Sequence, residues 1–140
     1  MSGVTGYGQD DRTAPGQDLG SSVARRSLGE RLVSRVISAY RGYNRAGFTD
    51  MVSDEFPGDR SVFVGNAEKS FYSALPIRLD FFVNTVTLSE EKLAVSFIWN
   101  KTSIPRDKGT TTNSSGECTF VFKKYDKNWL LYDVKGSSPF

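Results

Sequence analysis

Histidine is absent from this chain of 140 residues, and cysteine occurs once. The absence of histidine excludes a histidine-based catalytic triad, an imidazole metal ligand and an imidazole proton shuttle. A single cysteine excludes an intramolecular disulfide and the thiolate-rich zinc and iron–sulfur sites. We therefore predict no metal site and no cofactor.

The sequence also lacks a large excess of one charge sign and has no long apolar runs. The 18 Lys and Arg residues are nearly balanced by 16 Asp and Glu residues, which gives a net charge of +2. Nucleic-acid binding needs a clustered basic face, so we predict no nucleic-acid partner. No stretch reaches the length of a membrane span or contains the apolar core of a signal peptide, and we expect a soluble protein.

The first part of the chain, residues 1–26, contains five glycines and no helical or strand period. Such a segment buries too little apolar surface to offset the entropy of ordering. We predict a disordered arm over 1–26 and a single folded domain over 27–140. An arm of this kind remains when an export signal or a lipid anchor is removed, but a cytosolic tail can have the same composition. An exported and a cytosolic location therefore both stay open.

Helical periodicity begins after the arm. Ser27 and Glu30 have the spacing of a capping box, and Gly42 is a typical C-terminal stop. Between them, apolar residues recur at spacings of three and four and predict one buried stripe: Leu28, Leu32, Val33, Val36, Ile37 and Tyr40. A short second helix is expected over 46–53, and a third is expected to be capped by Asp59 and ended by Pro76.

After Pro76 the apolar period becomes two, which predicts strands. Alternating runs cover 77–84, 93–100, 118–123 and 129–134, with a polar loop expected over 104–115. Helices followed by a meander of strands indicate an α+β fold. We predict three N-terminal helices packed on a curved antiparallel sheet of about four strands.

The pattern of helices and strands resembles the NTF2-like superfamily, the cystatin-like α+β fold that includes SnoaL-like and ketosteroid-isomerase-like domains. The resemblance covers about 27–136 and is carried by the long first helix and by a series of strand positions: Ala94, Val95, Trp99, Gly116, Phe120, Phe122, Asp126, Trp129 and Val134. It implies a cone-shaped domain. The segment 54–60 is shorter than the hairpin that family members usually place there.

The resemblance also implies a pocket between the helices and the concave face of the sheet. Its candidate lining residues are Tyr40, Phe71, Trp99 and Phe120. An enzymatic alternative would use a buried carboxylate and a tyrosine, with Asp80 as the acid and Tyr40, Tyr43 or Tyr72 as its partner. Asp80 alternates with Leu79 and Phe81, however, and should point away from the core, so no catalytic residue is assigned.

The remaining reactive groups have structural explanations. The acidic cluster Asp54, Glu55 and Asp59 lacks the order of a calcium loop and is interpreted as a helix cap with a solvated turn. Cys118 shares a strand face with Phe120 and Phe122, so we predict a buried and unreactive thiol.

Large apolar residues also fall on the other face of the predicted sheet, at Phe82, Ile98 and Val121. In an antiparallel sheet with one solvent-exposed face, apolar and polar residues should alternate more regularly along each strand. We interpret these residues as a homodimer face or a docking surface. The alternative is that the loop over 104–115 or the tail 137–140 shields them.

The sequence thus favours a non-catalytic NTF2-like domain that binds a small apolar ligand or a protein partner. Two alternatives stay open. The first is an isomerase-, cyclase- or hydratase-type enzyme with a buried carboxylate and a tyrosine in the cleft, and the second is a dimeric module that works through the outer sheet face.

Overall fold

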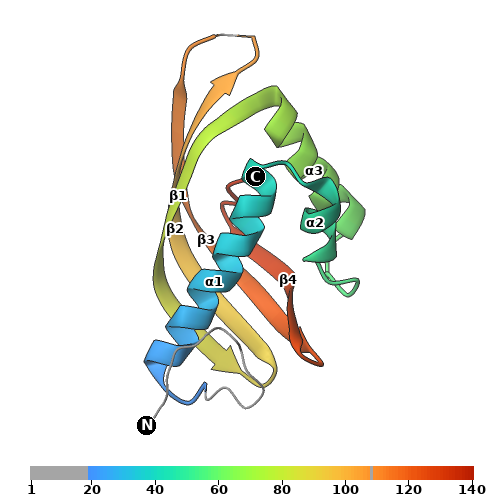
Figure 1. Ribbon diagram of the computed structural model, residues 1–140, viewed down its shortest axis with the longest axis vertical. Helices are drawn as coiled ribbons and strands as arrows, with labels where there is room; N and C mark the ends of the chain where they lie inside the picture. Colours follow the sequence, from blue (N-terminus) through green and yellow to red (C-terminus); the bar gives the residue numbers. More distant parts are fainter. Residues whose placement is uncertain (1–18, 108) are drawn as a thin grey trace.

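The computed structural model describes residues 19–107 and 109–140, in which three helices precede a four-stranded antiparallel sheet (Figure 1). The expected α+β order is confirmed. The elements are α1 (Ser22–Arg41), α2 (Arg45–Asp50), α3 (Arg60–Ser73), β1 (Ala74–Ser89), β2 (Lys92–Pro105), β3 (Thr112–Tyr125) and β4 (Asn128–Gly136).

Helix α1 begins earlier than the sequence predicted. Its N-cap is Ser21, whose hydroxyl oxygen accepts a hydrogen bond from the Ala24 amide at 3.1 Å, so the predicted start at Ser27 is wrong. Residues 22–26 of the predicted arm are therefore helical and residues 19–21 are not, whereas residues 1–18 lie outside the described residues. The predicted apolar stripe is buried throughout, which fixes the face that α1 turns to the sheet.

The two shorter helices start at polar caps. The Asn44 side chain accepts from the Gly47 amide at the start of α2, and Asp59 accepts from the amides of Ser61 and Val62 at the start of α3. The cap predicted at Asp59 is confirmed. Helix α3 ends at Ser73 rather than at Pro76, and β1 follows without a loop.

The strands lie in sequence order, β1-β2-β3-β4, and each pairs antiparallel with the next. Glu90 and Asp126 adopt positive φ angles of 58° and 55° at the two tight turns. The loop expected over 104–115 is shorter than predicted because β2 continues to Pro105 and β3 already begins at Thr112. An isolated parallel bridge joins Val52, just before the short segment 54–60, to Leu131 on β4.

The inner face of the sheet carries the core, including Leu93, Val95, Phe97, Phe120 and Phe122. The pairing of β1 with β2 shifts in register between Pro76 and Arg78. This irregularity changes which residues at the start of β1 face the core and which face solvent. Ile77, which alternation had placed with Leu79 on the inner face, is therefore 45% exposed.

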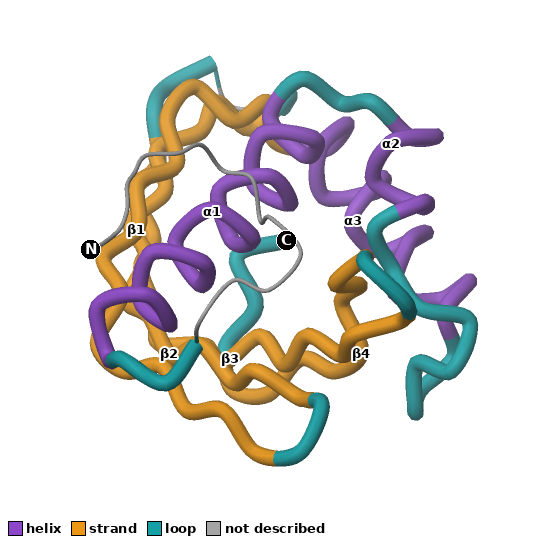
Figure 2. The backbone as a smooth tube through the Cα atoms, turned by 60° about the horizontal axis from the view of Figure 1, so that its bottom comes forward, coloured by secondary structure: helices purple, strands orange, loops and turns teal. Residues whose placement is uncertain are grey.

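The layers enclose an interior. Figure 2 looks into this cone: the strands curve along one side, α2 and α3 close the other, and α1 lies across the concave face of the sheet. The end of the chain lies inside the ring of elements, between α1 and β3. None of the helices within 19–107 and 109–140 combines the length and apolar character needed to cross a membrane.

Candidate functional site

The interior of the cone contains a small polar cluster at its centre. The Tyr40 hydroxyl on α1 and the Ser70 hydroxyl on α3 lie 2.8 Å apart. Lys101 Nζ on β2 donates to the Tyr40 oxygen at 3.1 Å and to the Ser70 oxygen at 3.4 Å. The Lys101 ammonium also lies 5.2 Å from the centre of the Tyr40 ring. Three different elements thus bring one cation and two hydroxyls together.

Aromatic rings form the walls around this cluster, and the Phe140 ring lies between them. Its centre is 4.7 Å from that of Tyr40, 5.3 Å from that of Phe48, 6.0 Å from that of Phe120 and 6.2 Å from that of Phe63. All four pairs have tilted or edge-to-face geometry, which aromatic quadrupoles favour. Phe140 therefore occupies the aromatic part of the interior.

Residues 137–140, here called the closing segment, turn into the cone and are held there by hydrogen bonds that side chains donate to their backbone carbonyl oxygens. Trp99 Nε1 donates to the Ser137 carbonyl oxygen at 2.8 Å, and Lys101 Nζ donates to the Pro139 carbonyl oxygen at 2.7 Å. The chain turns inward at Gly136, where φ is +84°. The suggestion that this tail shields the outer face of the sheet is therefore wrong.

Three of the four candidate pocket residues contact the closing segment, and the fourth packs on one of these three. Tyr40 and Phe120 contact the Phe140 ring, and Trp99 binds the backbone of Ser137. Phe71 packs edge-to-face on Tyr40, with ring centres 6.1 Å apart. The structure thus brings the four residues to one region of the cone.

Sequence reasoning missed Lys101, Ser70 and the closing segment. For Lys101 a signal existed, because it continues the alternation of Leu93, Val95, Phe97 and Trp99 and so belongs to the inner face. Ser70 lies one residue before Phe71 on α3 and carries no distinguishing pattern. The inward course of residues 137–140 depends on long-range contacts.

An open hollow of about 350 Å³ adjoins Phe140 at the mouth of the cone. It lies between α3, the second half of the α2–α3 connection and the end of β4, and its wall includes Phe56, Phe63, Asn66, Asp133 and Ser138. Its aromatic floor is continuous with the interior because Phe140 lines both.

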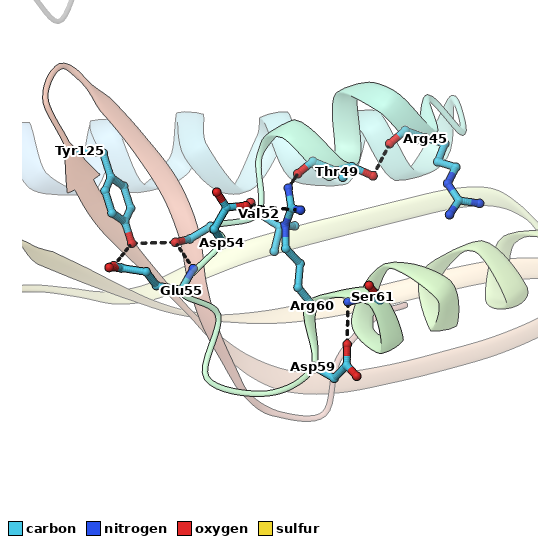
Figure 3. Close-up of polar contacts among 10 residues, drawn as sticks. Arg45, Thr49, Val52, Asp54, Glu55, Asp59, Arg60, Ser61 and Tyr125 are labelled. Atoms are coloured by element: carbon cyan, nitrogen blue, oxygen red, sulfur yellow. Dashed lines mark hydrogen bonds and ion pairs between the residues drawn. The ribbon is translucent and has the colours of Figure 1, made fainter.

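The α2–α3 loop (residues 51–59), which carries Phe56 to that mouth, is fixed by polar contacts (Figure 3). Arg60 donates to the carbonyl oxygens of Thr49 and Val52 at 2.9 and 3.2 Å and pairs with Asp54 at 3.4 Å. Tyr125 shares a hydrogen bond with Ser53 at 2.6 Å and donates to Glu55 at 2.7 Å. The loop therefore forms a fixed rim.

The acidic cluster of this loop is accounted for by these contacts. Asp59 caps α3, and Asp54 pairs with Arg60. Hydrogen bonds from Tyr125 and Lys123 lower the pKa of Glu55. No group of three or more metal-ligating side chains occurs among the described residues.

The candidate acid of the enzymatic alternative lies outside the cone. The Asp80 side chain is 56% exposed and pairs with Arg78 at 2.5 Å. Tyr43 and Tyr72 contact each other and Phe71 at the end of α3, away from Asp80. Within the part of the chain that the structure describes, no carboxylate is hydrogen-bonded to Tyr40, Ser70 or Lys101.

Cys118 is buried on the inner face of β3. Burial raises the pKa of its thiol to about 12, from an ordinary value of 9.0. The thiolate, which is the nucleophilic form, is therefore scarce at neutral pH.

On the outer face of the sheet, Phe82 and Ile98 lie directly opposite each other on β1 and β2. Phe82 is 61% exposed and Ile98 is 41% exposed. Val121 is half-buried and pairs with Ala94, four residues along β2 from Ile98. Two of the three candidate residues therefore form one apolar pair.

A second hollow, of about 430 Å³, follows the edge of β1 beside α1. Its wall includes Glu30, Ser34 and Phe81. Next to it the Arg26 guanidinium donates to the Val83 carbonyl oxygen and lies over the Phe82 ring. Covering an edge strand in this way blocks edge-to-edge pairing, and this structural role explains the arrangement.

No protein-family model matches the sequence, and no curated protein matches it. Solved structures do match. An NTF2-like superfamily protein from Salmonella enterica aligns over 85% of this chain and 93% of its own, with a TM-score of 0.66 and 15% identity. A ketosteroid isomerase-like protein from Erwinia carotovora atroseptica aligns over 81% of this chain and 96% of its own, with a TM-score of 0.66 and 13% identity.

A conserved protein from Planctomyces limnophilus aligns over 80% of this chain and 98% of its own, with a TM-score of 0.67 and 16% identity. At these identities the likeness concerns the fold. The helices, the curved sheet and these neighbours agree with the resemblance found in the sequence, and the chain has the NTF2-like fold.

Proposed function

We propose that this chain is a non-catalytic binding domain whose cone interior takes a small apolar ligand in the region now filled by residues 137–140. The observation that carries the proposal is the pairing of aromatic walls with one ammonium group, Lys101, at their centre. Ligand sites are typically apolar cavities with a few converging polar groups, and this interior has that composition.

The lack of an acid–base pair favours binding over catalysis. Proton abstraction beside a carbonyl needs a carboxylate or another base within hydrogen-bond reach of the substrate. Among the described residues, Lys101 has hydroxyl and carbonyl oxygens as partners, and Asp80 lies on the outside. A fold of this kind hosts many functions, so the assignment depends on the site.

The two tryptophans provide a test. Anilinonaphthalene sulfonate, an apolar aromatic anion that fluoresces in apolar surroundings, is added to the full chain while the proton–nitrogen NMR spectrum is recorded. Trp99 Nε1 is hydrogen-bonded to the Ser137 carbonyl oxygen, so a ligand in the cone should shift its indole signal. Trp129 on β4 is the internal control, and its indole signal should not shift.

The expected result is saturable fluorescence together with a saturable shift of the Trp99 indole signal alone. If neither fluorescence nor the Trp99 signal changes up to millimolar ligand, the proposed binding function is wrong.

A second candidate function is self-association through the outer sheet face, and the exposed pair Phe82 and Ile98 favours it. The substitution Ile98→Lys tests this. Lysine at 98 would lie opposite Glu117 on β3, so the monomer should tolerate it. A charge placed in an apolar interface should prevent pairing.

Sedimentation velocity at rising protein concentration is the measurement. We expect the natural chain to form dimers and Ile98→Lys to remain monomeric with an unchanged circular dichroism spectrum. A monomeric natural chain, or a dimeric variant, would contradict the interface.

A further inference from the structure

The closing segment shows which chemical groups the cone interior accommodates. Phe140 places its ring among Tyr40, Phe48 and Phe120. At the same time the preceding carbonyl oxygen, that of Pro139, accepts from Lys101 Nζ at 2.7 Å. The interior therefore receives an aromatic ring and an oxygen acceptor that are held at a fixed separation.

That separation is set by covalent geometry. The amide nitrogen, Cα and Cβ of Phe140 connect the Pro139 carbonyl carbon to the ring, and Pro139 itself is buried. A free compound with the same reach has a short saturated chain between an aromatic ring and a carbonyl or carboxyl carbon. Phenylbutyrate has three methylene groups in that position.

The charge of Lys101 selects among such compounds. Its partners among the described residues are the oxygens of Tyr40, Ser70 and Pro139, all of which are neutral. A half-buried ammonium group without a carboxylate partner gains more from an anionic acceptor than from a carbonyl, because charge-assisted hydrogen bonds are about twice as strong as neutral ones. An amine in the same place would be repelled.

We propose that the cone interior is specific for aryl-alkyl carboxylates, with Lys101 binding the carboxylate, and that residues 137–140 are an internal competitor for this site. The inference rests on the proposed binding function and names its ligand class. Binding then requires the closing segment to leave, so the apparent affinity of the natural chain is reduced by the fraction of molecules in which the site is vacant.

The experiment measures the binding of phenylbutyrate and of phenylbutylamine, its cationic counterpart, by calorimetry. The chains compared are the natural one, Phe140→Ala, and Phe140→Ala combined with Lys101→Met. Phe140→Ala vacates the ring position, and we expect it to bind phenylbutyrate about ten-fold more tightly than the natural chain does. It should also prefer phenylbutyrate over phenylbutylamine, and the added Lys101→Met change should abolish that preference.

A second measurement needs no variant. In the natural chain, saturating phenylbutyrate should move the amide signals of Ser138 and Phe140 to the values of an unstructured peptide, because the ligand replaces this segment. Circular dichroism of each variant confirms that the fold is retained, and if Phe140→Ala does not fold, this second measurement decides.

The outcomes separate the two proposals. Equal affinity of the natural chain and Phe140→Ala, an unchanged preference after Lys101→Met, or bound phenylbutyrate with the closing segment still in place would overturn the inference. Each of these leaves the binding function standing if anilinonaphthalene sulfonate still shifts the Trp99 indole signal.

Discussion

Phe120→Ala should lower the free energy of unfolding by about 3–5 kcal/mol, the usual range for removing a buried phenylalanine ring. Phe120 is fully buried on β3, between the rings of Phe97 and Phe140. It links the sheet core to the closing segment, so its loss leaves a cavity that neither side can fill without moving. A domain of this size has only about 5–15 kcal/mol of total stability, and the variant should be close to unfolding.

Urea denaturation followed by circular dichroism measures the effect. Val62→Ala is the control, since Val62 is exposed on α3 and its replacement should change stability by no more than about 0.5 kcal/mol. A loss below about 1 kcal/mol for Phe120→Ala would show that Phe120 does not pack as described.

Gly136→Ala should destabilise the protein by roughly 2–3 kcal/mol, because two effects add. At φ +84° the backbone is in a region that side chains disfavour, and a Cβ at this position would lie 2.7 Å from the Glu117 carbonyl oxygen. Relief of the clash requires the chain to turn away, which withdraws residues 137–140 from the cone.

Gly65→Ala is the matched control with the opposite sign. Gly65 lies within α3, and a methyl group there would meet no atom within 4 Å. Alanine in the interior of a helix is favoured over glycine by about 0.5–1 kcal/mol, so this variant should be more stable than the natural chain. If both glycine variants changed stability in the same direction, the turn at Gly136 would not have the conformation described.

The layered fold could be predicted because the signals for it are local. The stripe from Leu28 to Tyr40 and the cap at Asp59 act within a few residues of the chain, and the alternation of Leu93 to Trp99 requires only that one face of the sheet be buried. The first helix was predicted too short because Ser21 caps it as well as Ser27 could, and a single sequence does not distinguish the two caps.

The parts that the sequence did not predict depend on long-range contacts. The register shift at Pro76 turns Ile77 outward, and no local sequence pattern predicts this shift. Residues 137–140 were considered as a shield for the outer face of the sheet, because no local pattern shows that Phe140 packs among the aromatic rings of the interior. Lys101 was not singled out, although it continues the alternation of Leu93 to Trp99 and so belongs to the inner face of the sheet.

The composition of the site as a whole is the reason for proposing a binding function rather than a catalytic one. The aromatic walls and Lys101 can hold a ring and an anion, whereas the candidate acid Asp80 pairs with Arg78 at the surface. The same arrangement explains why the interior is filled: an ammonium group among apolar rings needs acceptors, and the Pro139 carbonyl oxygen supplies one.

The central claim is that the Phe140 ring lies within the aromatic interior of the cone, and nuclear Overhauser spectroscopy on the natural chain tests it most directly. Ring centres 4.7 Å from Tyr40 and 6.0 Å from Phe120 predict cross-peaks between the ring protons of Phe140 and those of both residues. Phe140 ring signals at the values of an unstructured peptide, without cross-peaks to either residue, would contradict the account.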